Sequence, residues 1–272
     1  MPAINSISAE KLSRLVGTPS CPAILDVRAG GAGLIPGAVR RSADDVARWG
    51  AAYQARAAIV LCRNGQEESP GVAAWLRHAG AQAEILEGGF EAWTGANRPI
   101  VNESVLPPRD EAGRTIWVTR CRPKVDRIAC PWLIRRFVDP GAVFLFVAPA
   151  EVAGVAGRFG AAPFDVDGAF WTHRGALCTF DVMVEEFGLA DLPALARLAI
   201  IVRGADTARP ELAPQSAGLV AASLGLSRMH ADDLEQLEAG MPLYDAFYRW
   251  CRDATDEVHD WVSHTPKARA RA

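Results

Sequence analysis

Short apolar runs alternate with segments of helical periodicity in the first third of the chain. The runs are rich in Ala, Ile, Leu and Val and end at polar or Gly-containing loops, which is typical of buried strands. The strands predicted from these runs cover 23–28, 59–62 and 83–86, and the predicted helices cover 8–15, 44–49 and 70–77. Because strands that alternate with helices form parallel sheets, this pattern predicts an α/β fold with a central parallel sheet.

A polar segment, residues 104–114, interrupts this pattern. It holds a Pro-Pro pair and a glycine, which disfavour regular structure, and we interpret it as a linker. The segment separates an N-terminal domain, residues 1–103, from a C-terminal domain, residues 115–272.

The C-terminal domain begins with strands and ends with helices. The predicted strands cover 115–120 and 142–147, and the predicted helices cover 127–137, 149–159, 195–205 and 243 to about 261. Asp126 is expected to cap the first of these helices. From Thr179 onward the pattern is almost wholly helical, so this domain is predicted to be α+β and mostly helical.

Composition narrows the class of protein. The chain has 272 residues, of which 50% are hydrophobic, enough for two domains with sizeable cores. A net charge of −3 gives no electrostatic surface for direct nucleic-acid binding, and no apolar stretch approaches the roughly 18–20 residues that span a bilayer. The six cysteines include no CxxC pair, and the N-terminus lacks a signal-peptide pattern. Together these features predict a protein of the reducing cytoplasm, without a membrane partner.

Cys62 is the main candidate for catalysis. It ends an apolar run and begins a polar loop that leads into a predicted helix. Backbone N–H groups of such a loop and the helix N-terminus stabilise an anion, so a thiolate or persulfide is favoured there. The residues expected to form this anion cradle are Arg63, Asn64, Gly65, Gln66, Glu67 and Glu68. Asp26 and Arg28, a charged pair at the end of a neighbouring predicted strand, are expected to support the loop.

The order of these motifs resembles that of a rhodanese domain. The resemblance covers residues 1–103 and rests on the Cys62 loop, the strand before Arg28 and the segments 33–39, 86–93 and 98–100. It implies an α/β fold and a cysteine that carries sulfane sulfur, received from a small donor such as thiosulfate and passed to a thiol acceptor. The catalytic cysteine is predicted to be Cys62.

One position departs from the family pattern. The family loop usually ends in arginine where this chain has Glu67, followed by Glu68. Carboxylates there repel thiosulfate and raise the thiol pKa, whereas the nearby Arg63 is expected to restore part of the positive potential. The sequence therefore predicts weak use of thiosulfate or a different donor. An inactive rhodanese-like module, used for structure or sensing, is the alternative.

The start of the C-terminal domain is dense in charged and bulky apolar residues. Residues 118–137, together with 163–165, 172–175 and 178–181, resemble the C-terminal domain of the chromate resistance protein family called ChrB. The resemblance runs from about residue 114 to 264 and implies a role in chromate resistance or its regulation.

Basic residues near a predicted helix start suggest an oxyanion site. Arg122, Lys124 and Arg127 are expected to lie close to a helix N-terminus, where chromate, sulfate or phosphate could bind. The alternative is a salt-bridged surface around a buried Trp132.

A second group of residues has the chemistry of metal ligands. The candidates are His173, Cys178, Asp181, Glu185 and Asp206, with Asp165 and Asp167 as further possibilities. Zinc, manganese or iron would suit them, but their spacing selects no single metal. A divalent metal is thus the one cofactor that the sequence suggests. The alternative assigns each residue an ordinary role on a helix surface or in the core.

Three functions follow from these features. The first is a sulfurtransferase that carries a persulfide on Cys62 and is associated with chromate resistance through its C-terminal domain. The second is a non-catalytic sensor of chromate or another oxyanion. The third is a metal-dependent enzyme centred on His173.

Overall fold

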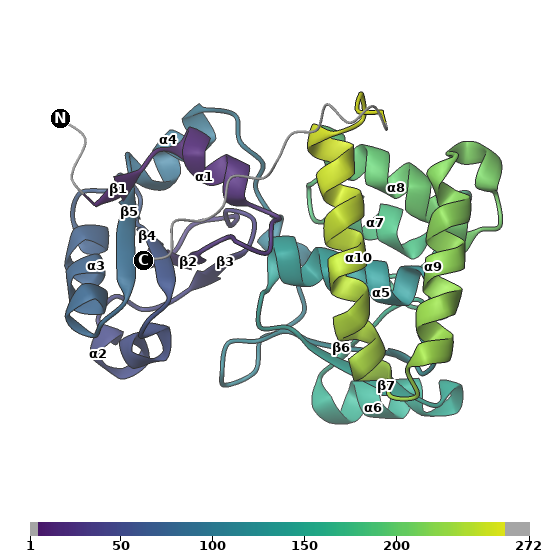
Figure 1. Ribbon diagram of the computed structural model, residues 1–272. Coiled ribbons are helices and arrows are strands. Elements are labelled where there is room, and N and C mark those ends of the chain that lie inside the picture. Colours follow the sequence, from purple (N-terminus) through teal and green to yellow (C-terminus); the bar gives the residue numbers. More distant parts are fainter. Residues whose placement is uncertain (1–4, 259–272) are drawn as a thin grey trace.

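A five-stranded, all-parallel sheet lies at the centre of the N-terminal half in the computed structural model, which describes residues 5–258 (Figure 1). The strand order is β1-β5-β4-β2-β3. The strands are β1 (Ser6–Ile7), β2 (Ala23–Asp26), β3 (Ala38–Arg40), β4 (Ala57–Leu61) and β5 (Gln82–Leu86). Strand β4 is buried from Ala58 to Leu61, as its continuous apolar run requires in the middle of a covered parallel sheet. The predicted α/β fold with a central parallel sheet is confirmed.

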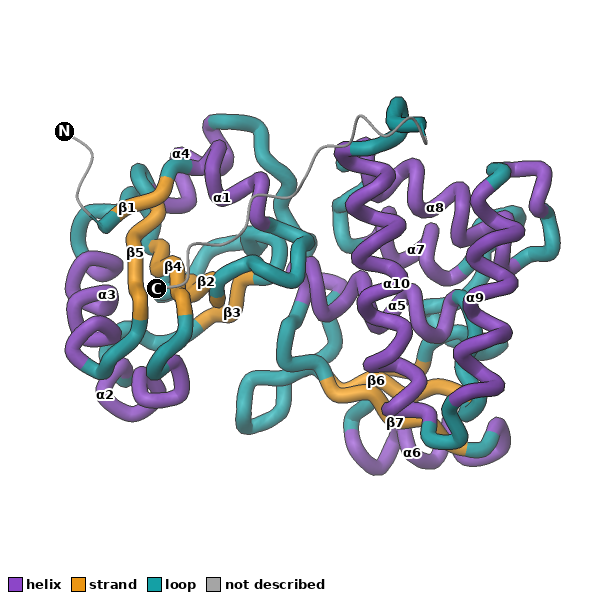
Figure 2. Tube along the Cα trace, viewed as in Figure 1, coloured by secondary structure: helices purple, strands orange, loops and turns teal. Residues whose placement is uncertain are grey.

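Helices cover both ends and the faces of this sheet (Figure 2). They are α1 (Ala9–Leu15), α2 (Val46–Trp49), α3 (Glu68–His78) and α4 (Gly89–Gly95), with a 3₁₀ turn at Gly50–Tyr53. Ser8 caps α1 by accepting the N–H of Lys11. Helix α3 begins two residues before the predicted start, because Pro70 is tolerated in a first helical turn, where its missing N–H breaks no hydrogen bond.

A small parallel sheet opens the C-terminal half, and helices make up most of the remainder. The sheet has the order β7-β6-β8, formed by β6 (Ile116–Arg120), β7 (Val143–Val147) and β8 (Ala162–Pro163). The helices are α5 (Asp126–Leu133), α6 (Val152–Phe159), α7 (Thr179–Glu186), α8 (Pro193–Asp206), α9 (Gln215–Met229) and α10 (Asp233–Asp253). Short turns are 3₁₀-helical at Glu103–Val105, Pro149–Glu151 and Pro210–Leu212 and π-helical at Ile134–Val138. The prediction of a mostly helical second half is confirmed.

Two helix predictions in this half differ from the structure. The predicted helix 127–137 is helical over its whole length, but it is regular only as α5, which ends at Leu133. A π-helical turn continues it to Val138, after Pro131 has removed one backbone N–H from the hydrogen-bond series. The last helix begins at Asp233 instead of 243, because the Asp232 side chain caps it and Pro242 is accommodated inside it. It ends at Asp253. Residue 261, its predicted end, lies outside the described residues.

The two halves share one hydrophobic core. The Phe137 ring is fully buried and packs against Gly17 so closely that a Cβ there would lie 2.2 Å from a ring carbon. Backbone hydrogen bonds join Gly37 N–H to the Phe137 carbonyl (2.6 Å) and Asn102 N–H to the Phe187 carbonyl (3.0 Å). One hydrophobic cluster therefore runs from the N-terminal half into the C-terminal half, while a second cluster, which includes Cys62, lies within the N-terminal half alone.

Among residues 5–258, no helix combines the length and the apolar character needed to cross a membrane.

Candidate functional sites

Cys62 directly follows the central strand β4, at the carboxyl edge of the parallel sheet. Its side chain is buried, and its Sγ lies 3.2 Å from Ser69 Oγ in the first turn of α3. Burial raises the pKa of the Cys62 thiol, but hydrogen bonds from the Ser69 hydroxyl and from the backbone N–H groups of Ser69, Gly65 and Glu67 outweigh it and lower the pKa below that of an ordinary cysteine. The loop thus stabilises a thiolate.

Two glycines allow the chain to close around this loop. Gly65 and Gly89 both have positive φ, and a Cβ on Gly89 would lie 2.5 Å from the Cys62 carbonyl oxygen. The segment after β5 is hydrogen-bonded to the loop. Phe90 N–H donates to the Cys62 carbonyl (2.9 Å), and Glu91 N–H donates to the Arg63 carbonyl (3.0 Å). The backbone geometry of the cradle is therefore fixed by neighbours outside the loop.

One member of the charged pair predicted to support the loop, Arg28, lines the cavity beside Cys62. Arg28 Nη2 lies 2.6 Å from Asp26 Oδ2, and its Nε also donates to the same carboxylate. The guanidinium carbon stands 3.5 Å from the centroid of the Phe90 ring. A cavity of about 550 Å³ opens beside Cys62, and Arg28 and Phe90 form part of its wall.

Acidic side chains are prominent around this cavity. Glu67, Glu68 and Glu91 line it together with Arg28 and Arg63. The Arg63 side chain is 77% exposed, and its Nε lies 3.6 Å from Glu91 Oε1. Arg63 was expected to restore positive potential near Cys62, but it pairs with this glutamate instead. Of the other loop residues, Asn64 accepts the Gln66 N–H (3.1 Å), and Gln66 itself is exposed. The cavity carries a slight excess of negative charge.

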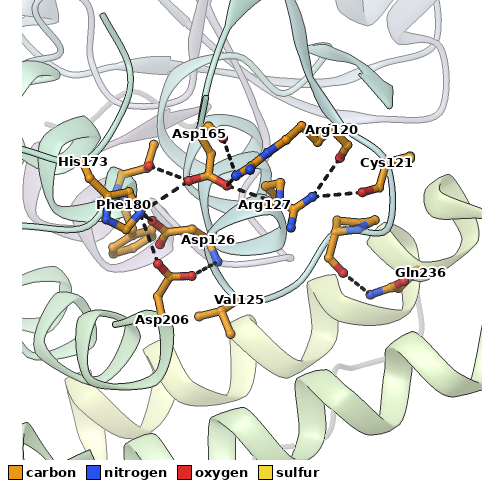
Figure 3. A network of polar contacts seen from close by, with 12 residues as sticks. Arg120, Cys121, Val125, Asp126, Arg127, Asp165, His173, Phe180, Asp206 and Gln236 are labelled. Atoms are coloured by element: carbon orange, nitrogen blue, oxygen red, sulfur yellow. Dashed lines mark hydrogen bonds and ion pairs between the residues drawn. The ribbon is translucent and has the colours of Figure 1, made fainter. Parts of the chain in front are cut away.

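A second polar cluster gathers where three segments of the C-terminal half meet (Figure 3). His173 Nε2 lies 3.2 Å from Asp206 Oδ2, 3.4 Å from Asp165 Oδ1 and 3.5 Å from Asp126 Oδ2. Asp126 is the first residue of α5, Asp206 is the last of α8, and Asp165 and His173 lie in the segment between β8 and α7. Residues distant in sequence thus converge on one imidazole.

Asp126 is the buried centre of this cluster. It was expected to cap its own helix, but it is the first helical residue, and its Oδ2 accepts the N–H groups of Thr179 (2.6 Å) and Phe180 (3.4 Å) at the start of α7. Burial, and then the Asp206 and Asp165 carboxylates, raise the pKa of Asp126. The preceding Val125 has a φ of 32°, a strained conformation for a β-branched residue, as is common at functional sites.

The predicted metal ligands separate into two groups. His173 and Asp206 come together, whereas Asp181 turns to Arg203 (3.7 Å) and accepts the Cys178 N–H (3.0 Å), and Glu185 is exposed. Burial raises the pKa of the Cys178 thiol, with Asp126 and Asp181 adding to the effect. Asp181 and Glu185 therefore lie outside the carboxylate–imidazole cluster, and the Cys178 thiol, which lies beside Asp126, is not among the ligand atoms that converge with His173. The structure shows Asp167 outside it as well, exposed in a turn.

The three basic residues predicted to bind an oxyanion are not brought together. The Arg122 side chain donates to the Ser227 carbonyl in the last turn of α9 and to the His230 and Ala231 carbonyls just after it, because helix C-termini attract cations. Arg127 Nε pairs with Asp165 Oδ2 (3.2 Å), and its Nη1 donates to two backbone carbonyls. Lys124 is exposed. Each guanidinium group is committed to a different partner.

Sequence reasoning missed one member of the cluster as a ligand-type residue. Asp126 was interpreted only as a helix cap, because its position before a helix has that common explanation. A signal was present in the chain: Asp126 stands between basic residues in the most charge-dense segment.

Comparisons with known proteins assign both halves. Residues 8–96 match the model of the rhodanese-like domain, and residues 117–251 match that of the ChrB C-terminal domain. The chain joins a rhodanese-like domain to a ChrB C-terminal domain. Protein ChrB of Cupriavidus metallidurans is 37% identical over 152 residues, which are 53% of this chain and 43% of that protein. The chain thus spans less than half of the length of this curated relative.

Solved structures resemble the rhodanese-like domain. A rhodanese-related protein from Thermoplasma volcanium is 22% identical and covers 36% of this chain and 97% of its own, with a TM-score of 0.32. The Alr3790 protein from Anabaena sp. is 31% identical and covers 35% of this chain and 81% of its own, with the same TM-score of 0.32.

The hydroxyl of Ser69 in the rhodanese-like domain has a testable effect on pH dependence. Replacing Ser69 by alanine removes a hydrogen bond that favours the thiolate, so the pKa of Cys62 rises. Because the thiolate is the reactive form, alkylation of Cys62 by iodoacetamide at neutral pH becomes several-fold slower, and its rate profile shifts to higher pH. Ser13→Ala, at a partly exposed position of α1, serves as the control. Unchanged pH profiles in both variants would contradict the assigned hydrogen bond.

Proposed function

We propose that the rhodanese-like domain transfers sulfur through a persulfide on Cys62, in a protein that contributes to chromate resistance. The observation that carries the proposal is the set of hydrogen bonds that lowers the pKa of a buried thiol at the carboxyl edge of a parallel sheet. A structural cysteine in an apolar interior has the opposite shift, as Cys130 shows, where burial raises the pKa of the thiol.

The proposed reaction has two steps. The Cys62 thiolate attacks the outer sulfur of a sulfane donor, a new S–S bond forms, and the old one breaks with its electron pair on the leaving group, which is sulfite or a thiolate. The persulfide anion then occupies the cradle, where the N–H groups of Gly65, Glu67 and Ser69 support its charge. An acceptor thiolate attacks the terminal sulfur and regenerates the Cys62 thiolate.

The charge of the cavity beside Cys62 affects which sulfur donor can bind there. Three glutamates and two arginines line it, and Asp26 already pairs with Arg28 while Glu91 pairs with Arg63. A dianion such as thiosulfate is repelled by the remaining carboxylates. The cavity therefore favours a donor with less negative charge close to its sulfur, such as the persulfide of a thiol.

The link to chromate comes from the second half of the chain. Protein ChrB is the curated relative, and the ChrB family is the chromate-resistance family that the motifs of this half resemble. We propose that sulfur transfer by the rhodanese-like domain serves this resistance. The arginines expected to bind chromate directly have other partners, so the proposal does not include a chromate site at Arg122 and Arg127.

The experiment is the intact mass of the purified full chain after incubation with glutathione persulfide or with thiosulfate. Wild type is expected to gain one sulfur atom, removable by cyanide, with the persulfide donor more effective than thiosulfate. Cys62→Ser should gain none, and Cys121→Ser, at a half-buried thiol in the other domain, should behave as wild type. No gain with either donor, or an equal gain in Cys62→Ser, would overturn the proposal.

A further inference from the structure

The carboxylate–imidazole cluster of the ChrB C-terminal domain has an excess of acidic groups. Asp126 and Asp206 both face His173, and within residues 5–258 His173 is the only basic side chain that forms an ion pair with either of them. Asp165, the third carboxylate, is held separately by Arg120 and Arg127, each with a nitrogen 3.2 Å from its Oδ2. One imidazole thus stands opposite two carboxylates that have no guanidinium partner in the described part of the chain.

Asp126 provides an independent observation that points to a bound cation. The residue is wholly buried, and its Oδ1 has no hydrogen-bond partner among the described residues. A buried carboxylate oxygen without a partner is costly, since it has lost its hydration without replacement. Its other oxygen is directed to the start of α7 and to His173. Because Asp126 Oδ2 faces His173, a cation between Asp126, His173 and Asp206 would compensate the charge of this buried and incompletely hydrogen-bonded carboxylate (Figure 3).

The distances fit coordination better than hydrogen bonding. The three carboxylate oxygens lie 3.2 to 3.5 Å from His173 Nε2, longer than the roughly 2.7–2.9 Å of a charge-assisted N–H···O bond. Ligand atoms about 2.1 Å from a tetrahedral metal ion lie about 3.4 Å from one another. One ligand atom each from Asp126, His173 and Asp206 lies within 4.8 Å of the other two, so these three can close on one ion with small side-chain movements.

The ligand atoms indicate which class of metal ion the site would bind. One imidazole nitrogen and two carboxylate oxygens suit a first-row divalent ion such as Zn²⁺ or Mn²⁺, whereas Ca²⁺ and Mg²⁺ prefer oxygen ligands alone. Exposure is graded across the site, from a buried Asp126 side chain (1%) through Asp206 (19%) to His173 (41%). The ion could therefore enter past His173 and keep a water or substrate ligand on that side.

We propose that Asp126, His173 and Asp206 bind a divalent transition-metal ion, with Asp165 as a neighbouring carboxylate oriented by Arg120 and Arg127. This site lies in the ChrB C-terminal domain and does not depend on the sulfur chemistry of Cys62. It differs from the ligand set expected from sequence by including Asp126 and excluding Cys178, Asp181 and Glu185.

The test uses the full chain, stripped of metal by a chelator and titrated with Mn²⁺ or Zn²⁺. Bound Mn²⁺ is followed by electron paramagnetic resonance, bound Zn²⁺ by elemental analysis, and both by the thermal unfolding midpoint. Mn²⁺ is informative because it binds thiolates poorly, so the six cysteines do not compete. Wild type is expected to bind a single ion with a raised midpoint, and Ca²⁺ at the same concentration should have little effect.

Two variants and a matched control make the outcome decisive. His173→Ala, at a partly exposed position, and Asp206→Asn are each expected to weaken binding by at least about tenfold and to abolish the midpoint shift. His230→Ala, at a histidine of the same domain that faces Glu235 instead, should bind as wild type. Equal binding by wild type, His173→Ala and Asp206→Asn, or no saturable binding by wild type, would overturn the proposal.

Discussion

Replacing Gly89 by alanine is expected to remove most of the reactivity of Cys62, although Gly89 lies outside the loop that carries this cysteine. The new Cβ would lie 2.5 Å from the Cys62 carbonyl oxygen and 2.7 Å from both the Arg63 carbonyl oxygen and the Gly65 nitrogen. All three atoms are backbone, so none can move aside as a side chain would. The φ of +58° adds about 1–2 kcal/mol of strain for any residue with a Cβ. The loop must shift, and the N–H groups no longer point at the sulfur.

Thiol alkylation at neutral pH and persulfide formation measure this effect, and each should fall by about tenfold or more. Gly71→Ala is the matched control, since a Cβ there meets no atom within 4 Å and its backbone is helical. If Gly89→Ala and Gly71→Ala reacted at the wild-type rate, the close approach between the two loops could not be what orders the cradle.

Trp132→Ala is expected to cause the largest loss of folding stability in the ChrB C-terminal domain. Trp132 is fully buried on α5, stacks on Phe180 of α7 and contacts Tyr244 and Tyr248 of α10. Its Nε1 also donates to Asp245 Oδ1 (2.8 Å). Truncating a buried aromatic residue of this size costs about 3–5 kcal/mol in the free energy of unfolding, because a cavity remains where three helices meet.

Urea unfolding followed by circular dichroism measures this loss. Trp75→Ala is the matched control, because its ring is half exposed on α3 and its removal leaves no cavity, so we expect a change of less than about 1 kcal/mol. Similar losses in the two variants would show that the aromatic contacts of Trp132 do not support the domain.

Much of the fold could be predicted because its signals are local. Strand β4 is an apolar run of residues that must be buried on both faces, and the alternation with helices left only a parallel sheet. The helix predictions failed at two prolines. Pro131 and Pro242 both lie inside helices, where the surrounding packing overrides the local preference, and sequence reasoning expected a regular helix at the first and a helix start at the second.

The candidate sites also differ in whether their residues are close in sequence. Cys62 and the cradle that receives it lie within a few residues of one another, so spacing alone placed them together. His173, Asp126 and Asp206 come from three segments, and only their packing shows that they meet. The i, i+4 spacing of Asp181 and Glu185 indicated a shared helix face correctly, but not which way that face points. The partners of Arg122 also come from a distant helix end, which the sequence does not reveal.

The close fit between Phe137 and Gly17 has a consequence for how the whole chain behaves. A ring from one domain fills a hollow that the other domain leaves open, and adjacent backbone hydrogen bonds fix its position. If the chain were cut between the domains, the cut would expose an apolar ring on one fragment and an apolar hollow on the other. The orientation of the Cys62 cavity relative to the His173 cluster is therefore set by packing rather than by a flexible tether.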